Sequence, residues 1–108
     1  VWLAGGEGPA GLYLNESAAG QPLAFRRQDS GLEVTAATGA YPADIDGDGI
    51  TDLLVLRVGE NLLMRGLPGC RFERANESWG FDGGDGWSAA AAITWEPGAT
   101  WPTIAVGN

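Results

Sequence analysis

The most constraining feature of this sequence is an acidic loop that runs directly into an apolar segment. The loop reads Asp44-Ile-Asp-Gly-Asp-Gly-Ile-Thr-Asp52, and the apolar segment Leu53–Val58 follows it. Four carboxylates fall at positions 1, 3, 5 and 9 of this nine-residue loop, and a glycine stands at position 6. Two carboxylates roughly 4 Å apart repel by about 4 kcal/mol at an effective dielectric of about 20. A cation that lies between the carboxylates would remove this repulsion.

The residue types and their spacing favour Ca²⁺ as that cation. Ca²⁺ takes 6–8 oxygen ligands at about 2.3–2.6 Å, and short flexible loops rich in Asp supply them. We therefore predict a calcium site to which Ile50 contributes its backbone carbonyl. The predicted side-chain ligands are Asp44, Asp46, Asp48 and Asp52. The alternative is a solvated acidic turn, because Asp and Gly are ordinary turn formers.

The residues after the loop distinguish it from an EF-hand. An EF-hand needs a Glu at position 12 and a helix that follows the loop. Position 12 is Val55, within a run of Leu and Val that is typical of a buried strand. The stretch from Ala43 to Val55 resembles the calcium loop and strand of FG-GAP/VCBS repeats, which occur in integrin alpha-subunit propellers and in bacterial cartilage-acidic-protein-like proteins. This resemblance implies a β-propeller fold.

An internal repeat extends the same interpretation to most of the chain. At an offset of 50 residues, Leu12–Leu14 falls on Leu62–Met64, and Leu53–Leu56 falls on Thr103–Val106. About four short strands in each 40–50 residues are typical of a propeller blade. We therefore predict an all-β fold made of about two blades' worth of four-stranded antiparallel repeats. Because a ring needs about four to eight blades, the chain is expected to be a segment of a larger propeller.

The predicted division of the chain follows from this repeat. Residues 1–34 are expected to form the outer strands of a first blade, and residues 35–76 a complete blade that carries the calcium loop. Residues 77–108 are expected to form the inner strands of a further blade. The residues 50 positions after the four predicted side-chain ligands are Thr94, Glu96, Gly98 and Pro102. Only one of these is acidic, so the second loop is predicted to be degenerate and to bind no cation.

The charge and the residue types argue against several classes of function. The net charge is −8, and all six basic residues are arginine, so neither nucleic acid nor an anionic membrane is an expected partner. The chain has no histidine and no lysine, which removes Ser-His-Asp catalysis, histidine-bound zinc and Schiff-base chemistry. No apolar run reaches the ~18 residues of a membrane-spanning helix. We therefore do not expect the chain itself to be an enzyme.

Two further features of the sequence leave alternatives open. The tryptophans suggest a carbohydrate-binding surface, but packing between blades is the favoured explanation for Trp79, Trp87, Trp95 and Trp101. Asn15-Glu-Ser and Asn76-Glu-Ser both match the N-glycosylation sequon. Whether either asparagine is glycosylated depends on the source organism.

The expected function is that of a calcium-binding propeller module with a structural or adhesion-like role. Its expected partners are other blades or chains, and a protein or carbohydrate ligand. Because extracellular Ca²⁺ modules bind at about 10⁻⁴–10⁻³ M, an extracellular, cell-surface or periplasmic location is expected. Two alternatives are a segment of a propeller enzyme whose catalytic residues lie elsewhere, and an extracellular subunit that assembles with copies of itself through unpaired terminal strands.

Overall fold

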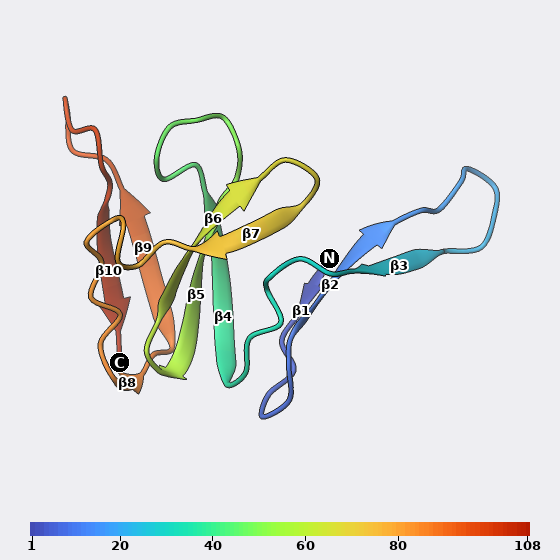
Figure 1. Cartoon of the computed structure of the whole chain (residues 1–108), viewed down its shortest axis with the longest axis horizontal. Coiled ribbons are helices and arrows are strands. Elements are labelled where there is room, and N and C mark those ends of the chain that lie inside the picture. Colours follow the sequence, from blue (N-terminus) through green and yellow to red (C-terminus); the bar gives the residue numbers. More distant parts are fainter.

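The computed structural model describes all 108 residues and contains strands but no helix (Figure 1). The predicted all-β class is therefore confirmed. The N-terminal sheet consists of β1 (Trp2–Leu3), β2 (Gly11–Asn15) and β3 (Phe25–Gln28). The central sheet consists of β4 (Ala37–Ala43), β5 (Asp52–Gly59), β6 (Leu62–Leu67) and β7 (Arg71–Arg74). The C-terminal hairpin consists of β9 (Ala90–Thr94) and β10 (Thr103–Gly107), and the short β8 (Gly86–Trp87) pairs with the end of β5.

The three groups of strands lie side by side, with the central sheet between the other two (Figure 1). Every pairing is antiparallel, and the central sheet has the order β4-β5-β6-β7, so each strand pairs with its neighbour in the sequence. None of the elements is a helix that could cross a membrane. The row of sheets is open, and no ring closes within these residues.

The central sheet is buried on both faces, which explains why β5 is a continuous apolar run. Leu54, Val55 and Leu56 are all inaccessible to solvent. Val55 faces the N-terminal sheet, in a cluster that Trp2 and Leu12 cover. Leu54 and Leu56 face the opposite way, toward the C-terminal hairpin and its Ile104 and Val106. Burial of one such side chain stabilises the fold by about 1.5–3 kcal/mol.

The strand registers define the internal repeat more closely than the sequence does. Ala43 pairs with Asp52 at the start of one hairpin, and Thr94 pairs with Thr103 at the start of the other, so equivalent residues are 51 positions apart. The offset of 50 is therefore wrong by one residue in these strands. Because successive side chains of a strand point to opposite faces, this difference exchanges the buried and the exposed positions.

The corrected offset places apolar residues on equivalent faces. Leu53 corresponds to Ile104 and Val55 to Val106, and all four side chains pack toward the preceding sheet. The intervening Ala105 is exposed, as are Thr103 and Gly107. The C-terminal hairpin thus repeats the β4–β5 hairpin in register, loop length and direction of packing.

Candidate metal centre

The acidic loop connects β4 to β5, and its own carboxylates hold its backbone in place. Asp44 accepts a hydrogen bond from the N–H of Gly49 at 3.0 Å, Asp46 accepts one from Asp48 at 3.2 Å, and Asp48 accepts one from Ile50 at 2.8 Å. Gly47 and Gly49 have φ values of 75° and 86°, which residues with a side chain rarely adopt. The Asp-Gly alternation therefore specifies a tightly coiled loop.

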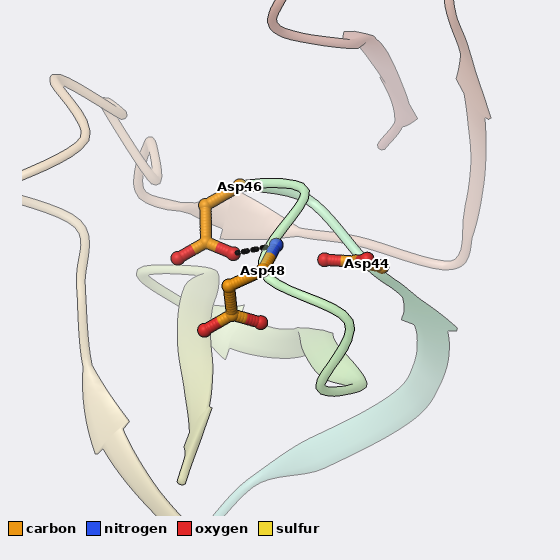
Figure 2. Close-up of side chains that lie close together, drawn as sticks. All are labelled: Asp44, Asp46 and Asp48. Atoms are coloured by element: carbon orange, nitrogen blue, oxygen red, sulfur yellow. Dashed lines mark hydrogen bonds between the residues drawn. The ribbon is translucent and has the colours of Figure 1, made fainter.

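Three of the predicted ligands lie together at the surface of this loop (Figure 2). One carboxylate oxygen from each of Asp44, Asp46 and Asp48 lies within 4.8 Å of the other two. Oxygens bound to one Ca²⁺ at about 2.3–2.6 Å are at most about 5 Å apart. The spacing therefore fits a single Ca²⁺ bound between the three side chains. Asp44 and Asp48 are exposed and Asp46 is half-buried, so solvent can reach the cluster.

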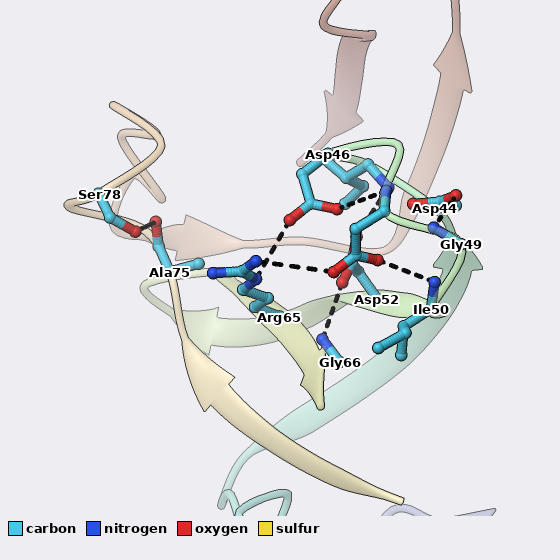
Figure 3. Close-up of polar contacts among 11 residues, drawn as sticks. Asp44, Asp46, Gly49, Ile50, Asp52, Arg65, Gly66, Ala75 and Ser78 are labelled. Carbon is cyan, nitrogen blue, oxygen red and sulfur yellow. Dashed lines mark hydrogen bonds and ion pairs between the residues drawn. The ribbon is translucent and has the colours of Figure 1, made fainter. Parts of the chain in front are cut away.

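The fourth predicted side chain, Asp52, is held differently (Figure 3). Asp52 is fully buried, and its two oxygens accept hydrogen bonds from the N–H groups of Ile45 at 2.7 Å and Gly66 at 2.8 Å. It is not a member of the three-carboxylate cluster. Each carboxylate oxygen of Asp52 keeps a further lone pair that could bind a cation. The role of Asp52 as a ligand therefore stays a prediction. Its observed role is to attach the acidic loop to β6.

The backbone approaches very closely where Asp52 makes this attachment. A Cβ atom on Gly66 would lie 2.1 Å from the carbonyl oxygen of Thr51. Only glycine fits there, because real Cβ atoms do not come so near another heavy atom. The predicted backbone ligand, Ile50, packs at the same place with its side chain 2.9 Å from that Cβ position. The coordination by its carbonyl stays a prediction.

Arg65 is the residue at the site that the sequence analysis missed. Its Nε lies 3.1 Å from Oδ2 of Asp46 (Figure 3), and its Nη2 lies 3.6 Å from Oδ2 of Asp48. The Nε–H is buried but makes no hydrogen bond, so the contact with Asp46 is an ion pair without hydrogen-bond alignment. Met64 pairs with Leu53, and this register places Arg65 beside the loop. Arg65 could have been identified from the sequence only if the pairing register of β5 and β6 had been predicted.

The electrostatics of the site centre on Asp46. Burial raises the pKa of Asp46, and the nearby carboxylates of Asp52 and Asp48 raise it further. A hydrogen bond from the N–H of Asp48 and the charge of Arg65 oppose this change, but the net direction is upward. The negative charge of Asp46 is therefore under-compensated in the fold, as expected at a site that gains from a bound cation.

The second hairpin loop carries no comparable cluster. It has the same length as the acidic loop, and the residues 51 positions after the four predicted side-chain ligands are Trp95, Pro97, Ala99 and Thr103. None of these residues is acidic. The corrected offset of 51 therefore removes Glu96, the one acidic residue that the offset of 50 had placed at a ligand position. In the region between β7 and β9, Asp82 accepts a hydrogen bond from Gly84, and Asp85 is exposed beside Gly59. Neither aspartate belongs to a group of three or more ligand-type side chains.

Three of the four tryptophans that were predicted to pack between blades are exposed in this chain. Trp79 and Trp101 contact each other in a tilted pair with ring centroids 5.8 Å apart. They line a cavity of about 240 Å³ beside the acidic loop, together with Ile45, Leu63 and Phe81. Trp87 is 70 % exposed, and Trp95 and Trp101 are 42 % and 50 % exposed. Trp79 packs between the central sheet and the C-terminal hairpin, as predicted, and the packing of the other three tryptophans against further blades stays a prediction.

The two sequons are not equivalent in the folded chain. Asn15 is exposed at the end of β2. Asn76 is buried, accepts a hydrogen bond from the N–H of Leu63 and donates one to the carbonyl of Asn61. Asn76 therefore has a structural role, and of the two only Asn15 is open to modification after folding.

Comparisons of the chain with protein-family models, with curated proteins and with solved structures gave no match.

Proposed function

We propose that this chain is a calcium-binding β-propeller module of the FG-GAP/VCBS type with a structural role. The observation that supports the proposal best is the cluster of Asp44, Asp46 and Asp48, whose oxygens lie within 4.8 Å of one another. The resemblance of the loop to FG-GAP/VCBS repeats and the three side-by-side antiparallel sheets support it further. In this proposal the central sheet is one complete blade, and the other two groups of strands belong to its neighbours.

The proposed role of the ion is to fix the loop that connects β4 and β5. Three carboxylates at this spacing repel one another, and Arg65 opposes only part of that repulsion, because it is 41 % exposed. A bound Ca²⁺ would remove the remaining repulsion and would stabilise the observed conformation of the loop. If free Ca²⁺ exceeds the dissociation constant 10- to 100-fold, the free energy of unfolding rises by about 1.4–2.7 kcal/mol.

The proposed setting is outside the cytoplasm. Extracellular modules typically bind Ca²⁺ with dissociation constants of about 10⁻⁴–10⁻³ M, and a site built from three accessible carboxylates suits that range. We infer no catalytic role for this chain. A protein or carbohydrate ligand would bind elsewhere on the assembled propeller, or at the exposed tryptophans.

The proposal is tested by thermal unfolding and by calorimetric titration with Ca²⁺. We expect the melting temperature to rise with Ca²⁺ and to return to its starting value when a chelator is added. Asp46→Asn removes one charge but keeps the shape of the side chain, and it should abolish the response. Asp82→Asn, in a loop outside the cluster, is the matched control and should keep the response. Equal melting temperatures of the unmodified chain with Ca²⁺ and with chelator would refute the proposal.

A further inference from the structure

The loop that joins β2 to β3 stands apart from the rest of the chain. It connects Asn15, the last residue of β2, to Phe25, the first residue of β3, whereas the equivalent loop between β6 and β7 is only Pro68–Cys70. Figure 1 shows it at the opposite end of the molecule from the C-terminal hairpin. Every residue from Ala18 to Arg27 is exposed. A bulky group attached to this loop would therefore meet solvent.

The contacts that close the base of this loop come from its own residues. The N–H of Glu16 donates a hydrogen bond to the carbonyl of Ala24 at 2.8 Å. The hydroxyl of Ser17 accepts one from the N–H of Ala24 at 2.8 Å and donates one to the carbonyl of Ala24 at 3.3 Å. The side-chain oxygen of Asn15 accepts one from the N–H of Ser17 at 2.9 Å. Asn15 and Ser17 are therefore held next to each other where the loop begins.

The side-chain nitrogen of Asn15 is the polar group that these contacts leave free. Its oxygen is bonded to Ser17, but its Nδ2 has no hydrogen-bond partner in the chain, and the side chain is exposed. Asn15-Glu-Ser is one of the two N-glycosylation sequons, and in such a sequon the sugar is attached to this nitrogen. A glycan on Asn15 would therefore displace no contact of the folded chain.

The second sequon, Asn76-Glu-Ser, provides a comparison within the same chain. Nδ2 of Asn76 donates hydrogen bonds to the carbonyl of Asn61 at 2.8 Å and to Oε1 of Glu60 at 3.2 Å, and Oδ1 accepts one from the N–H of Leu63 at 2.7 Å. Asn76 is only 3 % exposed. A sugar on its nitrogen would break these contacts and would have no room, so a chain glycosylated at Asn76 could not form the observed central sheet.

We propose that the folded chain carries an N-linked glycan at Asn15 and none at Asn76. The donor is an oligosaccharide linked to a polyprenyl diphosphate. The bond from its anomeric carbon to the diphosphate oxygen breaks, and the diphosphate leaves with the electron pair. A new bond joins the anomeric carbon to Nδ2 of Asn15, and one amide proton passes to a base of the transferase. The transferase recognises the hydroxyl of Ser17 as part of the sequon.

This inference rests on one part of the proposed function, the setting outside the cytoplasm, because such glycans are added to chains that enter the secretory pathway. It does not depend on the calcium site. The Ca²⁺-dependent rise in melting temperature is measured on chain that carries no glycan, so the failure of one proposal is distinguishable from the failure of the other.

Mass spectrometry of the chain secreted from a eukaryotic cell, behind a cleavable signal sequence, tests the proposal. Trypsin cuts after arginine, so the two sequons lie in separate fragments, Val1–Arg26 and Ala75–Asn108. We expect the first fragment to carry one glycan and the second to carry none. A peptide N-glycosidase should remove the glycan and leave aspartate at its attachment site, which identifies Asn15 because the first fragment contains no other asparagine.

Two substitutions at one position provide the matched control. Ser17→Ala removes the hydroxyl that the sequon needs but keeps Asn15, so it should abolish the glycan. Ser17→Thr keeps a hydroxyl, so it should retain the glycan. Asn15→Gln should abolish the glycan as Ser17→Ala does. Circular dichroism of the same variants, produced without glycan in a bacterial cytoplasm, distinguishes loss of the sequon from loss of the fold.

Two outcomes in the secreted protein would overturn the proposal. One is a fragment Val1–Arg26 that has the mass of the bare peptide before the glycosidase is added. The other is a glycan on Ala75–Asn108 in a chain whose circular dichroism matches that of the folded protein. Where little chain is secreted, translation in the presence of endoplasmic-reticulum microsomes reports the transfer directly. Ser78→Ala then leaves Asn15 in the only sequon, and a variant that gains no glycan there would also overturn the proposal.

Discussion

Gly47 and Gly98 occupy the same position in two hairpin loops 51 residues apart, and both have a positive φ, 75° and 80° respectively. The two loops have the same length and connect equivalent strands. Only the first has a cluster of carboxylates. The hairpin can therefore form without Asp at the ligand positions, so the turn alone does not explain the acidic residues of the first loop. The proposed cation-binding role would explain them.

Replacement of Asp52 by asparagine should destabilise the chain even without Ca²⁺. Asp52 is buried, and its two oxygens accept hydrogen bonds from Ile45 and Gly66. An amide keeps only one acceptor oxygen, so one buried backbone N–H loses its partner or faces another donor. The expected decrease in the free energy of unfolding is about 1.5–3 kcal/mol, measured by urea denaturation in chelator. Asp48→Asn, at an exposed position, should cost less than half as much; equal losses would contradict the attachment role of Asp52.

Replacement of Arg65 by methionine should have opposite effects in chelator and in Ca²⁺. Methionine keeps much of the apolar stem but removes the charge beside Asp46 and Asp48. Partly exposed ion pairs contribute about 0.2–1 kcal/mol, so stability in chelator should fall by about that amount. The affinity for Ca²⁺ should rise, because the ion no longer competes with the guanidinium. Arg71→Met, on the exposed outer strand, is the control; a lower affinity for Ca²⁺ in Arg65→Met would refute the competition.

Glu33 should make the stability of the chain depend on pH in the acid range. Desolvation acts to raise its pKa, but hydrogen bonds from the N–H and hydroxyl of Ser30 and from the N–H of Gly31 outweigh it, so the pKa lies below its ordinary value of 4.5. The stabilisation is therefore fully present above the unfolded pKa and is lost as pH falls through the lower folded pKa. Glu33→Gln should remove this loss. Urea denaturation of both proteins between neutral and strongly acidic pH measures it; parallel pH curves would contradict the assignment.

The sequence predicts the strands of the central sheet well because their signals are strong and local. The run from Leu53 to Val58 lies within β5 (Asp52–Gly59), and the repeated segment Leu62–Met64 lies within β6 (Leu62–Leu67). Glycine and proline mark the turns between these strands, and the long apolar run follows from burial on both faces. The cluster of three carboxylates was also predictable, because their spacing lies within one loop.

The register of the repeat and the role of Asp52 were not predictable in the same way. Strand β9 is mostly alanine, so its pattern of buried and exposed positions is too weak to distinguish an offset of 50 from one of 51. Asp52 has the residue type of a ligand, but its partner Gly66 is 14 residues away and belongs to another strand. Arg65 also lies on another strand, β6, and contacts the loop only because β6 pairs with β5. Contacts between strands depend on pairing, and the composition of one segment does not contain that information.

The strongest test of the loop is to build a cation site where the chain has none. The triple variant Trp95→Asp, Pro97→Asp and Ala99→Asp gives the second loop carboxylates at the three positions equivalent to the observed cluster. All three residues are exposed, so the change leaves the core intact. In the Asp46→Asn background, where the first site is disabled, the variant should regain a Ca²⁺-dependent rise in melting temperature. The rise should be smaller than that of the natural loop, because Thr103 stands where the first loop has Asp52.

The control for this graft carries asparagine at the same three positions, which matches aspartate in size but has no charge. In chelator, the aspartate variant should be less stable than the asparagine control, because three carboxylates repel without an arginine beside them. Ca²⁺ should reverse that order. If the aspartate variant gains no stability from Ca²⁺ while the natural loop does, loop geometry and three carboxylates are insufficient. The contacts of Asp52 and the neighbouring strand β6 would then have to be counted as part of the metal centre.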